Sequence, residues 1–361
     1  MDQSFILTRR AAVLGIGAAS LAGCARRETY EQAVAATWRL EPPTGGFPVQ
    51  ALVHAATLAA NSHNTQAWRF VPVGQRIRIA PDLSRRTPAV DPDDHHMFVS
   101  LGCAAETMLQ AAGLYGWAGT VEAVHIREGV TLAFIPSVMG PGPLATAIPR
   151  RASTRSIYDG RPVSGQVLRD LAQAVGGAEG LSLITDRRRL DQATDFIVQG
   201  DRAQVGDAAF RRELKAWIRF DAPEALARRD GLFAASTGNP TLPRLVGERL
   251  FDLAFTDKGE TDKTVRQMRS SAGLAVFTSA TGGPSGWVEA GRAFTRFALT
   301  ATAAGLKLAF LNQPVEDAAT RPDFARWLGV ADRRPDLVVR FGHGPDLPRS
   351  LRRSASQVLV A

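Results

Sequence analysis

Two polar clusters in the chain hold residue types that bind small molecules. The first begins at Asn61 and carries Ser62, Asn64 and Gln66 at alternate positions, with no charge before Arg69. Neutral donors and acceptors of this kind suit hydrogen bonding to a flat heterocycle with polar edges. Asn and Ser also make helix caps and turns routinely, so a purely structural loop is the alternative. The cluster is a candidate contact for the edge of a planar ligand.

The second cluster is basic and lies near the middle of the chain. Arg151 and Arg155 flank Ser153, and two guanidinium forks with one hydroxyl match the oxygens of a phosphate. Arg352 and Arg353, near the end of the printed sequence, would complete the same anion site. The alternative is a solvated basic linker.

Composition limits the classes of function. The chain has 361 residues, of which 45% are hydrophobic and 22% charged, as is typical of a globular protein with one large or two ordinary domains. Its formal net charge of +8 comes mainly from arginine. A nucleic-acid binder would concentrate such charge in a patch with interleaved aromatics, whereas these arginines are scattered. We therefore expect no nucleic-acid partner.

The segment from Thr8 to Cys24 contains Gly15 and Gly17 and could suggest a nucleotide-binding turn. A dinucleotide fingerprint needs a preceding strand and a third glycine three residues after the second. Ser20 occupies that third place, and no strand of useful length fits before Gly15. We interpret the segment as an address and not as a site.

The same segment resembles a signal for export. Arg9 and Arg10 precede a mildly apolar run, similar to a twin-arginine signal, and Leu21-Ala22-Gly23-Cys24 resembles a lipobox in which Cys24 is acylated. The resemblance implies export to the periplasm or cell envelope by the twin-arginine translocase, a route that moves folded, often cofactor-loaded chains. The lipid on Cys24 would be the only membrane link, because no later run approaches the roughly 18 apolar residues of a span.

The first half of the chain has the pattern helix, strand, strand, helix, strand, strand. Cys103 falls on the apolar spacing of the second helix, so we expect it to pack in the core. The expected elements are a helix at Pro48–Ala60, strands at Trp68–Val73 and Arg76–Ile79, a helix from Phe98 to Ala112, a hairpin of Thr120–Val124 and Val130–Phe134, and a connector from Pro136 to Pro149.

The second half contains a matching unit. Gly102 and Gly116 recur 189 positions later as Gly291 and Gly305, each pair spanning a helix that leads into a strand. A duplicated fold can build, from the two halves of one chain, a site that a homodimer builds from two subunits. We expect a signal at 1–23, a first half at 24–149 and a second half at 150–361.

Four segments, in order, resemble the FMN-binding nitroreductase family, and their split resembles its exported, tandem, single-chain Acg-type branch. They are Ser62-x-Asn64-x-Gln66-x-Trp68, Arg151-x-Ser153-x-Arg155 with Asp159-x-Arg161-Pro162-Val163, Gly305-Leu306 through Leu311-Asn312-Gln313-Pro314, and Arg352-Arg353. The first motif lies only in the first half and the Arg/Ser/Arg motif only in the second. Ala67 departs from the family's usual Pro, and the stretch from Asp91 to His96 departs from a Gly-Arg-Glu pattern.

The resemblance implies an α+β, nitroreductase-like fold: two related halves, each with a helix-flanked, mostly antiparallel sheet, fused as an intramolecular pseudo-dimer. It implies a monomeric, FMN-dependent oxidoreductase that passes hydride through flavin N5 from a small-molecule donor to a nitroaromatic- or quinone-like acceptor, with no catalytic side chain required. Arg155 would also tune the N1 edge of the ring. The implied phosphate contacts are Arg151, Ser153, Arg155 and Arg352 or Arg353, and the implied ring contacts are Ser62, Asn64, Gln66, Asn312 and Gln313.

Other functions stay open at this point. An exported flavin-binding or flavin-sequestering protein with little turnover would use the same site, covered by a segment within 230–241. Neither a Gly-x-Ser-x-Gly hydrolase motif nor a phosphate-loop motif occurs. His95 and His96 follow acidic residues and suggest a metal, but adjacent histidines chelate poorly and no second ligand cluster is evident. We expect them in a solvated loop near the mouth of the flavin site, without a metal.

Overall fold

The computed structural model of the chain describes residues 28–40, 45–176 and 180–360. The predicted signal of residues 1–23 and the predicted acylation of Cys24 lie outside this part of the chain. The connector from Pro136 to Pro149 and both polar clusters lie within it.

The first half has the predicted order of elements. Its sheet has the strand order β1-β2-β4-β3, and every pairing is antiparallel. Gly74, at a φ of 58°, forms the turn between the first two strands, because a left-handed backbone there costs glycine little. The elements are α2 (Val49–Thr57), β1 (Trp68–Val73), β2 (Arg76–Pro81), α3 (His95–Ala112), β3 (Trp117–His125) and β4 (Gly129–Pro136).

The second half repeats this plan. Its sheet has the order β5-β8-β10-β9, again with antiparallel pairings throughout, and the long helix α10 (Gly283–Ala303) joins its second and third strands as α3 does in the first half. Gly116 and Gly305 follow the long helices with φ values of 76° and 77°. The strands are β5 (Leu181–Ile184), β8 (Gly273–Thr278), β9 (Lys307–Phe310) and β10 (Pro335–Gly342). The predicted α+β class with two related halves is confirmed.

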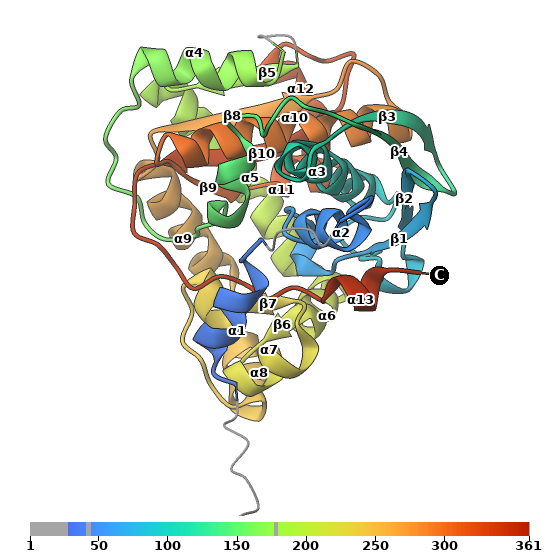
Figure 1. Cartoon of the computed structure of the whole chain (residues 1–361). Helices are drawn as coiled ribbons and strands as arrows, with labels where there is room; N and C mark the ends of the chain where they lie inside the picture. The colour runs from blue at the N-terminus through green and yellow to red at the C-terminus, as the bar shows by residue number, and fades with distance from the viewer. Residues whose placement is uncertain (1–27, 41–44, 177–179, 361) are drawn as a thin grey trace, which may run out of the picture.

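The two long helices pack against each other at the centre of the molecule (Figure 1). A Cβ on Gly102 would lie 2.0 Å from the carbonyl oxygen of Val288, and a Cβ on Gly291 would lie 2.0 Å from that of Val99. Val99 and Val288 are also 189 positions apart, so each helix makes the same contact with the other. Such a reciprocal contact is the mark of a two-fold interface, here inside one chain.

The second half also carries a large insertion between β5 and β8, where the first half has only a tight turn between β1 and β2. The segment α6–α8, with the short parallel strands β6 and β7, forms what we call the inserted lobe, at the bottom of Figure 1. The insertion comprises α5 (Arg187–Gly206), α6 (Ala208–Trp217), β6 (Ile218–Arg219), α7 (Ala222–Arg228), β7 (Leu232–Phe233), α8 (Arg244–Ala254) and α9 (Asp257–Arg269).

Each end of the described chain packs on the half to which it does not belong: the N-terminal end on the inserted lobe and the C-terminal end on the first half. Tyr30 and Ala33 of α1 (Tyr30–Thr37) pack on the inserted lobe beside Phe233. The C-terminal segment returns to the first half, where the Val360 N–H donates to the Phe70 carbonyl at 2.9 Å. The remaining helices are α4 (Gly165–Ala174), α11 (Gln313–Glu316), α12 (Arg321–Leu328) and α13 (Ala355–Val358). The two predicted halves therefore interlock.

One helix bears on the expectation that no segment after the signal spans a membrane. Within the described residues, the helical stretch His95–Tyr115 is long and apolar enough to cross a bilayer by length and composition. Most of it is buried inside the protein, because α3 packs against α10 on one side and α2 and the first sheet on another. Its apolar character is that of a core helix.

Candidate functional site

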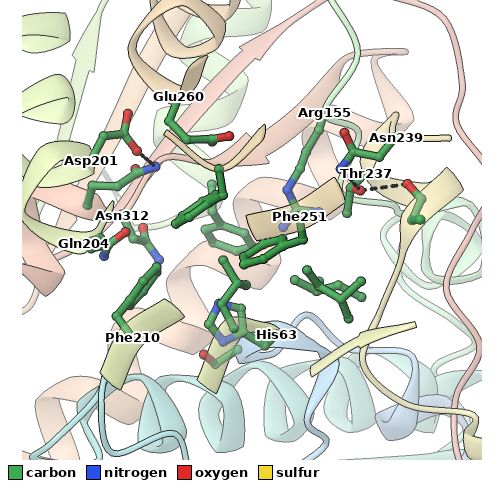
Figure 2. A pocket seen from close by; sticks show the side chains of 18 of the residues that line it. His63, Arg155, Asp201, Gln204, Phe210, Thr237, Asn239, Phe251, Glu260 and Asn312 are labelled. Carbon is green, nitrogen blue, oxygen red and sulfur yellow. Dashed lines mark hydrogen bonds between the residues drawn. The ribbon is translucent and has the colours of Figure 1, made fainter. Parts of the chain in front are cut away.

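A cavity of about 520 Å³ lies between the first half and the insertion. Its floor is formed by α3 through Val99, Ser100 and Cys103, and the inserted lobe and α9 close it from the other side. The size is within the range of cofactor and small-ligand pockets. Figure 2 shows side chains from far-apart parts of the sequence bordering this one space.

Most of the cavity wall is apolar. The inserted lobe supplies Phe210 from α6 and Phe251 from α8, with Phe255 just beyond that helix, and Phe310 comes from β9. Such a wall excludes water and offers flat surfaces for an aromatic ligand. The segment proposed from sequence as a cover, 230–241, contributes Leu232, Ala234, Thr237, Asn239 and Pro240 to the same wall.

The first polar corner comes from the cluster that follows α2. Ser62 and His63 line the cavity, and His63, Asn64 and Gln66 all have positive φ, between 46° and 54°. A backbone of this kind is costly for residues other than glycine and persists where the surroundings impose it, as at binding sites. Burial, with nearby Arg155, lowers the pKa of His63 to about 4, so the imidazole is neutral at pH 7. Its Nδ1 is buried and unpartnered in the part of the chain that the structure describes.

Of the residues that the structure describes, two cations line this cavity, and Lys263 is ion-paired with Glu260 at 2.8 Å, which leaves Arg155 as the one to account for. Its side chain borders the cavity close to His63 (Figure 2), and burial lowers its pKa. Among the described residues no carboxylate forms an ion pair with it, whereas a guanidinium withdrawn from water is normally paired. The position is suited to an anionic group on a ligand.

The opposite corner is lined by amides and a carboxylate. Asn312 Oδ1 accepts from the Val338 N–H at 2.9 Å, and Gln313 Nε2 donates to Asp201 Oδ1 at 2.9 Å. Gln313 Oε1 is buried and has no partner within the described residues. Burial raises the pKa of Asp201 to about 6, although the Thr264 hydroxyl donates to it at 2.6 Å. This corner presents an amide oxygen that still needs a donor.

Asn64 and Gln66 were predicted to contact the ring, but the structure does not place their side chains in the cavity wall. Asn64 Nδ2 donates to the carbonyls of Gly231 and Leu351 at 2.9 and 3.1 Å, and Gln66 Nε2 donates to the carbonyl of Arg229 at 2.9 Å. Both amides therefore tie the inserted lobe to the first half. Of the predicted motif, Ser62 alone faces the cavity.

The residues predicted to bind the phosphate do not lie together at the cavity. Arg151 donates to the Leu58 carbonyl at 3.0 Å and Arg352 to the Thr57 carbonyl at 2.9 Å, so both arginines bind the C-terminal end of α2, where cations are favoured. Burial lowers the pKa of Arg151 to about 10 and that of Arg352 to about 9. Arg353 binds the carbonyl of Gln66 instead.

Ser153 forms a bridge with Leu308 of β9, and its neighbour Thr154 donates its N–H to the Leu308 carbonyl at 2.7 Å. It does not line the cavity. Among the Arg151, Ser153 and Arg155 trio, the structure therefore brings Arg155 alone to the cavity.

The solvated loop expected for His95 and His96 was wrong. They begin α3, and both side chains are buried, His95 at 0% exposure. The Asp91 carboxylate caps this helix by accepting the N–H groups of His96 and Met97. His95 Nε2 lies 2.8 Å from Asp336 Oδ1, and burial holds the pKa of His95 well below its usual range. The imidazole therefore donates to the carboxylate as a neutral group.

His96 does line the cavity. Asp91, His95 and His96 are also the one group of possible metal ligands that come close together in the described residues, within 4.8 Å of one another. The Asp91 oxygens already serve as the helix cap, and His95 is bound to Asp336.

Apart from the segment 230–241, sequence reasoning missed the contribution of the insertion. Phe251 and Phe255 stand four positions apart, a helical spacing that was available as a signal. Asp201 of α5 gave no such signal, because it meets Gln313 only through the folding of two distant segments.

Comparison with known proteins gives relatives over most of the chain. No protein-family model matches the sequence. Two proteins of Mycobacterium tuberculosis, from strains CDC 1551 and H37Rv, are each 28% identical over 326 residues, which cover 86% of this chain and 90% of their own length. Both are provisionally named NAD(P)H nitroreductases.

Among solved structures, the chain is similar to the FMN-dependent nitroreductase NfnB of Mycobacterium smegmatis in complex with NADPH, at 15% identity and a TM-score of 0.38. That match covers 60% of this chain and 99% of NfnB. It is also similar to an FMN-bound nitroreductase of Bacteroides fragilis, at 14% identity and a TM-score of 0.33, with 57% of this chain and 90% of that one covered.

Proposed function

We propose that this protein is an FMN-dependent oxidoreductase of the nitroreductase type, which passes hydride from a small-molecule donor to a nitroaromatic- or quinone-like acceptor. The observation that carries the proposal is the position of Arg155: a guanidinium without a carboxylate partner in the described chain, at the wall of a largely apolar cavity. The names of the relatives that match most of the chain support the same activity.

The polar groups of the cavity fit a flavin. His63 Nδ1 and Gln313 Oε1 are buried without partners in the described residues, and buried polar atoms are normally satisfied. A heterocycle with donors and acceptors along its edge would satisfy both. Ser62 and Asn312 would add neutral contacts, and Arg155 would meet a negative group of the cofactor.

FMN, when bound, supplies the hydride transfer. The protein orients it and controls its surroundings: Phe210 and Phe251 keep water from the cavity, and the neutral His63 can accept or donate a hydrogen bond without adding charge. Arg155 would favour a ligand that gains negative charge on reduction. Six predicted contacts would require a change of hydrogen-bond partner before they could reach the cofactor. They are Arg151, Ser153, Arg352 and Arg353 for the phosphate, and Asn64 and Gln66 for the ring.

The proposal includes the location and the stoichiometry. We propose that residues 1–23 direct export to the periplasm or cell envelope, that Cys24 carries a lipid, and that one monomer, built from halves 24–149 and 150–361, binds one FMN. The reciprocal packing of α3 and α10 supports the last point, because the two halves already form the pair that subunits would form.

One experiment tests the activity. The full chain is purified with its cofactor, flavin is released by denaturation and quantified per chain, and reduction of the bound flavin is followed with NADPH, NADH and a quinol analogue. About one FMN per monomer and rapid reduction by one of the donors are expected. Bound FMN that all three reduce slowly would favour sequestration over turnover, and absence of FMN would contradict the proposal.

A further inference from the structure

The outward face of α8 is apolar. Leu245 and Leu253 are 78% and 74% exposed, and Val246 is exposed beside them. Isolated exposed leucines are normal, but large apolar side chains gathered on one helix face mark an interaction surface. We call Leu245, Val246 and Leu253 the α8 face.

The opposite side of the same helix borders the cavity. Phe251 lies in the cavity wall, Leu250 reaches from that wall to the surface, and Gly247 packs closely on Phe220. The helix α8 is therefore the one layer of described structure that separates the cavity from the surroundings of the α8 face.

The start of the described chain lies next to this helix. Glu28 is ion-paired with Arg229, just after α7, at 2.8 Å, and Glu224 in the first turn of α7 is ion-paired with Arg244, the first residue of α8. A helix of seven residues is about 10 Å long. Two ion pairs and the length of α7 therefore link Glu28 to the beginning of α8.

The distance from Cys24 to Glu28 is short. Glu28 is four positions after Cys24 in the sequence, and an extended chain of that length reaches at most about 14 Å. A lipid on Cys24 would hold Glu28 within that distance of a bilayer surface, and the inserted lobe, which Glu28 contacts through Arg229, carries the α8 face. Arg228 and Arg249, which are exposed on α7 and α8, match the negative charge of anionic headgroups.

We propose that the α8 face docks on the lipid bilayer, with Leu245, Val246 and Leu253 entering the interface. The proposal rests on the acylation of Cys24 proposed above. The docked face would add a second contact to the lipid anchor, which fixes the orientation of the inserted lobe on the membrane. Docking would place the wall formed by Leu250 and Phe251 beside the bilayer, so that lipid-soluble donors or acceptors of the quinone class are presented to the cavity.

The test uses the full chain, loaded with FMN, with Cys24→Ser to remove the lipid. Its binding to vesicles of phosphatidylcholine with about a quarter phosphatidylglycerol is measured by co-sedimentation. The double variant Leu245→Gln/Leu253→Gln should bind these vesicles at least about tenfold more weakly, because it removes apolar area from the interface. Val138→Gln/Met139→Gln is the matched control: both residues are exposed, in the loop after β4.

The proposal is overturned if the Cys24→Ser protein does not bind the vesicles, if the control pair loses as much binding as the α8 pair, or if the α8 pair only converts a dimer to a monomer in sedimentation velocity. FMN content, read from absorbance, should be equal in all variants. Vesicle binding without bound flavin would defeat the proposed function and leave docking intact, and flavin reduction without vesicle binding would do the reverse.

Discussion

The helices α3 and α10 contact each other reciprocally, yet the two sides of this helix pair differ. We call these two sides its flanks. On one flank, Val99, Ser100 and Cys103 of α3 line the cavity. The positions 189 residues later are Val288, Glu289 and Arg292 of α10. Here the small, neutral residues of α3 are matched by charged residues at two of the three places.

Glu289 and Arg292 form ion pairs that fill the second flank. Glu106 Oε2 accepts from Arg292 at 3.0 Å and from Arg296 at 3.2 Å, and Glu289 is within 2.7 and 2.9 Å of the same two arginines. The Glu106 side chain is 4% exposed. The described residues thus form a compact ion-pair network where the other flank has a cavity.

The comparison teaches that the two sides of the paired halves differ: one holds a cavity and the other an ion-pair network. The insertion between β5 and β8 builds a wall on the cavity flank, and ion pairs fill the other. A homodimer must treat its two flanks alike, whereas a fused pair lets one bind and the other stabilise. The following experiments break or sharpen this division, from the largest expected effect to the smallest.

Gly102→Ala and Gly291→Ala should each destabilise the protein by about 3 kcal/mol or more, and by similar amounts. A Cβ at either place would lie 2.0 Å from a backbone carbonyl oxygen of the facing helix, and overpacking forces the backbone to move. Urea unfolding measures the loss. Gly206→Ala at the end of α5 is the control, since an added Cβ there meets nothing within 4 Å. Unequal losses would speak against a reciprocal interface.

Arg155→Ala should weaken FMN binding by roughly tenfold to a hundredfold, since a good charge-assisted contact contributes about 1.5–3 kcal/mol. Fluorescence titration of the apoprotein measures it. Arg151→Ala is the comparison: because Arg151 binds the Leu58 carbonyl, it should lower stability more than affinity. Riboflavin lacks the phosphate, so an Arg155→Ala loss confined to FMN assigns Arg155 to the phosphate, and equal losses assign it to the ring. No loss for either ligand would remove Arg155 from the site.

Glu106→Gln should lower stability by about 1–2 kcal/mol and leave FMN affinity unchanged. It removes the charge that faces Arg292 and Arg296, and both arginines are partly exposed, so solvent moderates the cost. Thermal unfolding and the flavin titration are measured on the same samples. A loss of FMN affinity as large as the loss of stability would show that the two flanks are not independent.

Asp201→Asn should change the pH dependence of stability. Burial raises the pKa of Asp201 to about 6 in the folded protein, above its ordinary value of 3.8. The folded state therefore binds this proton more tightly, and wild-type stability falls as pH rises from about 4 to about 6. The Asn variant should lack that fall and gain relative stability above pH 6. Parallel pH profiles for the two proteins, from urea unfolding, would contradict the assignment.

Much of the architecture could be predicted from the sequence, because it follows from local patterns of apolar residues and glycines. The order of elements in the first half follows from apolar spacing, and Gly102, Gly116, Gly291 and Gly305 identified the duplication, because close helix contact and left-handed turns both demand glycine. The candidate site was predicted only in part: Ser62, Arg155, Asn312 and Gln313 line the cavity.

The sequence by itself determined the two-part plan, the polar clusters and the chemistry that their residue types allow. Only the tertiary structure decided which of those residues face the cavity. Asn64, Gln66, Arg151 and Arg352 carry suitable groups but bind backbone carbonyls, since a polar side chain in a folded core bonds to whatever partner the packing brings near. His95 and His96 likewise bond to a distant residue, Asp336, which the fold brings next to them.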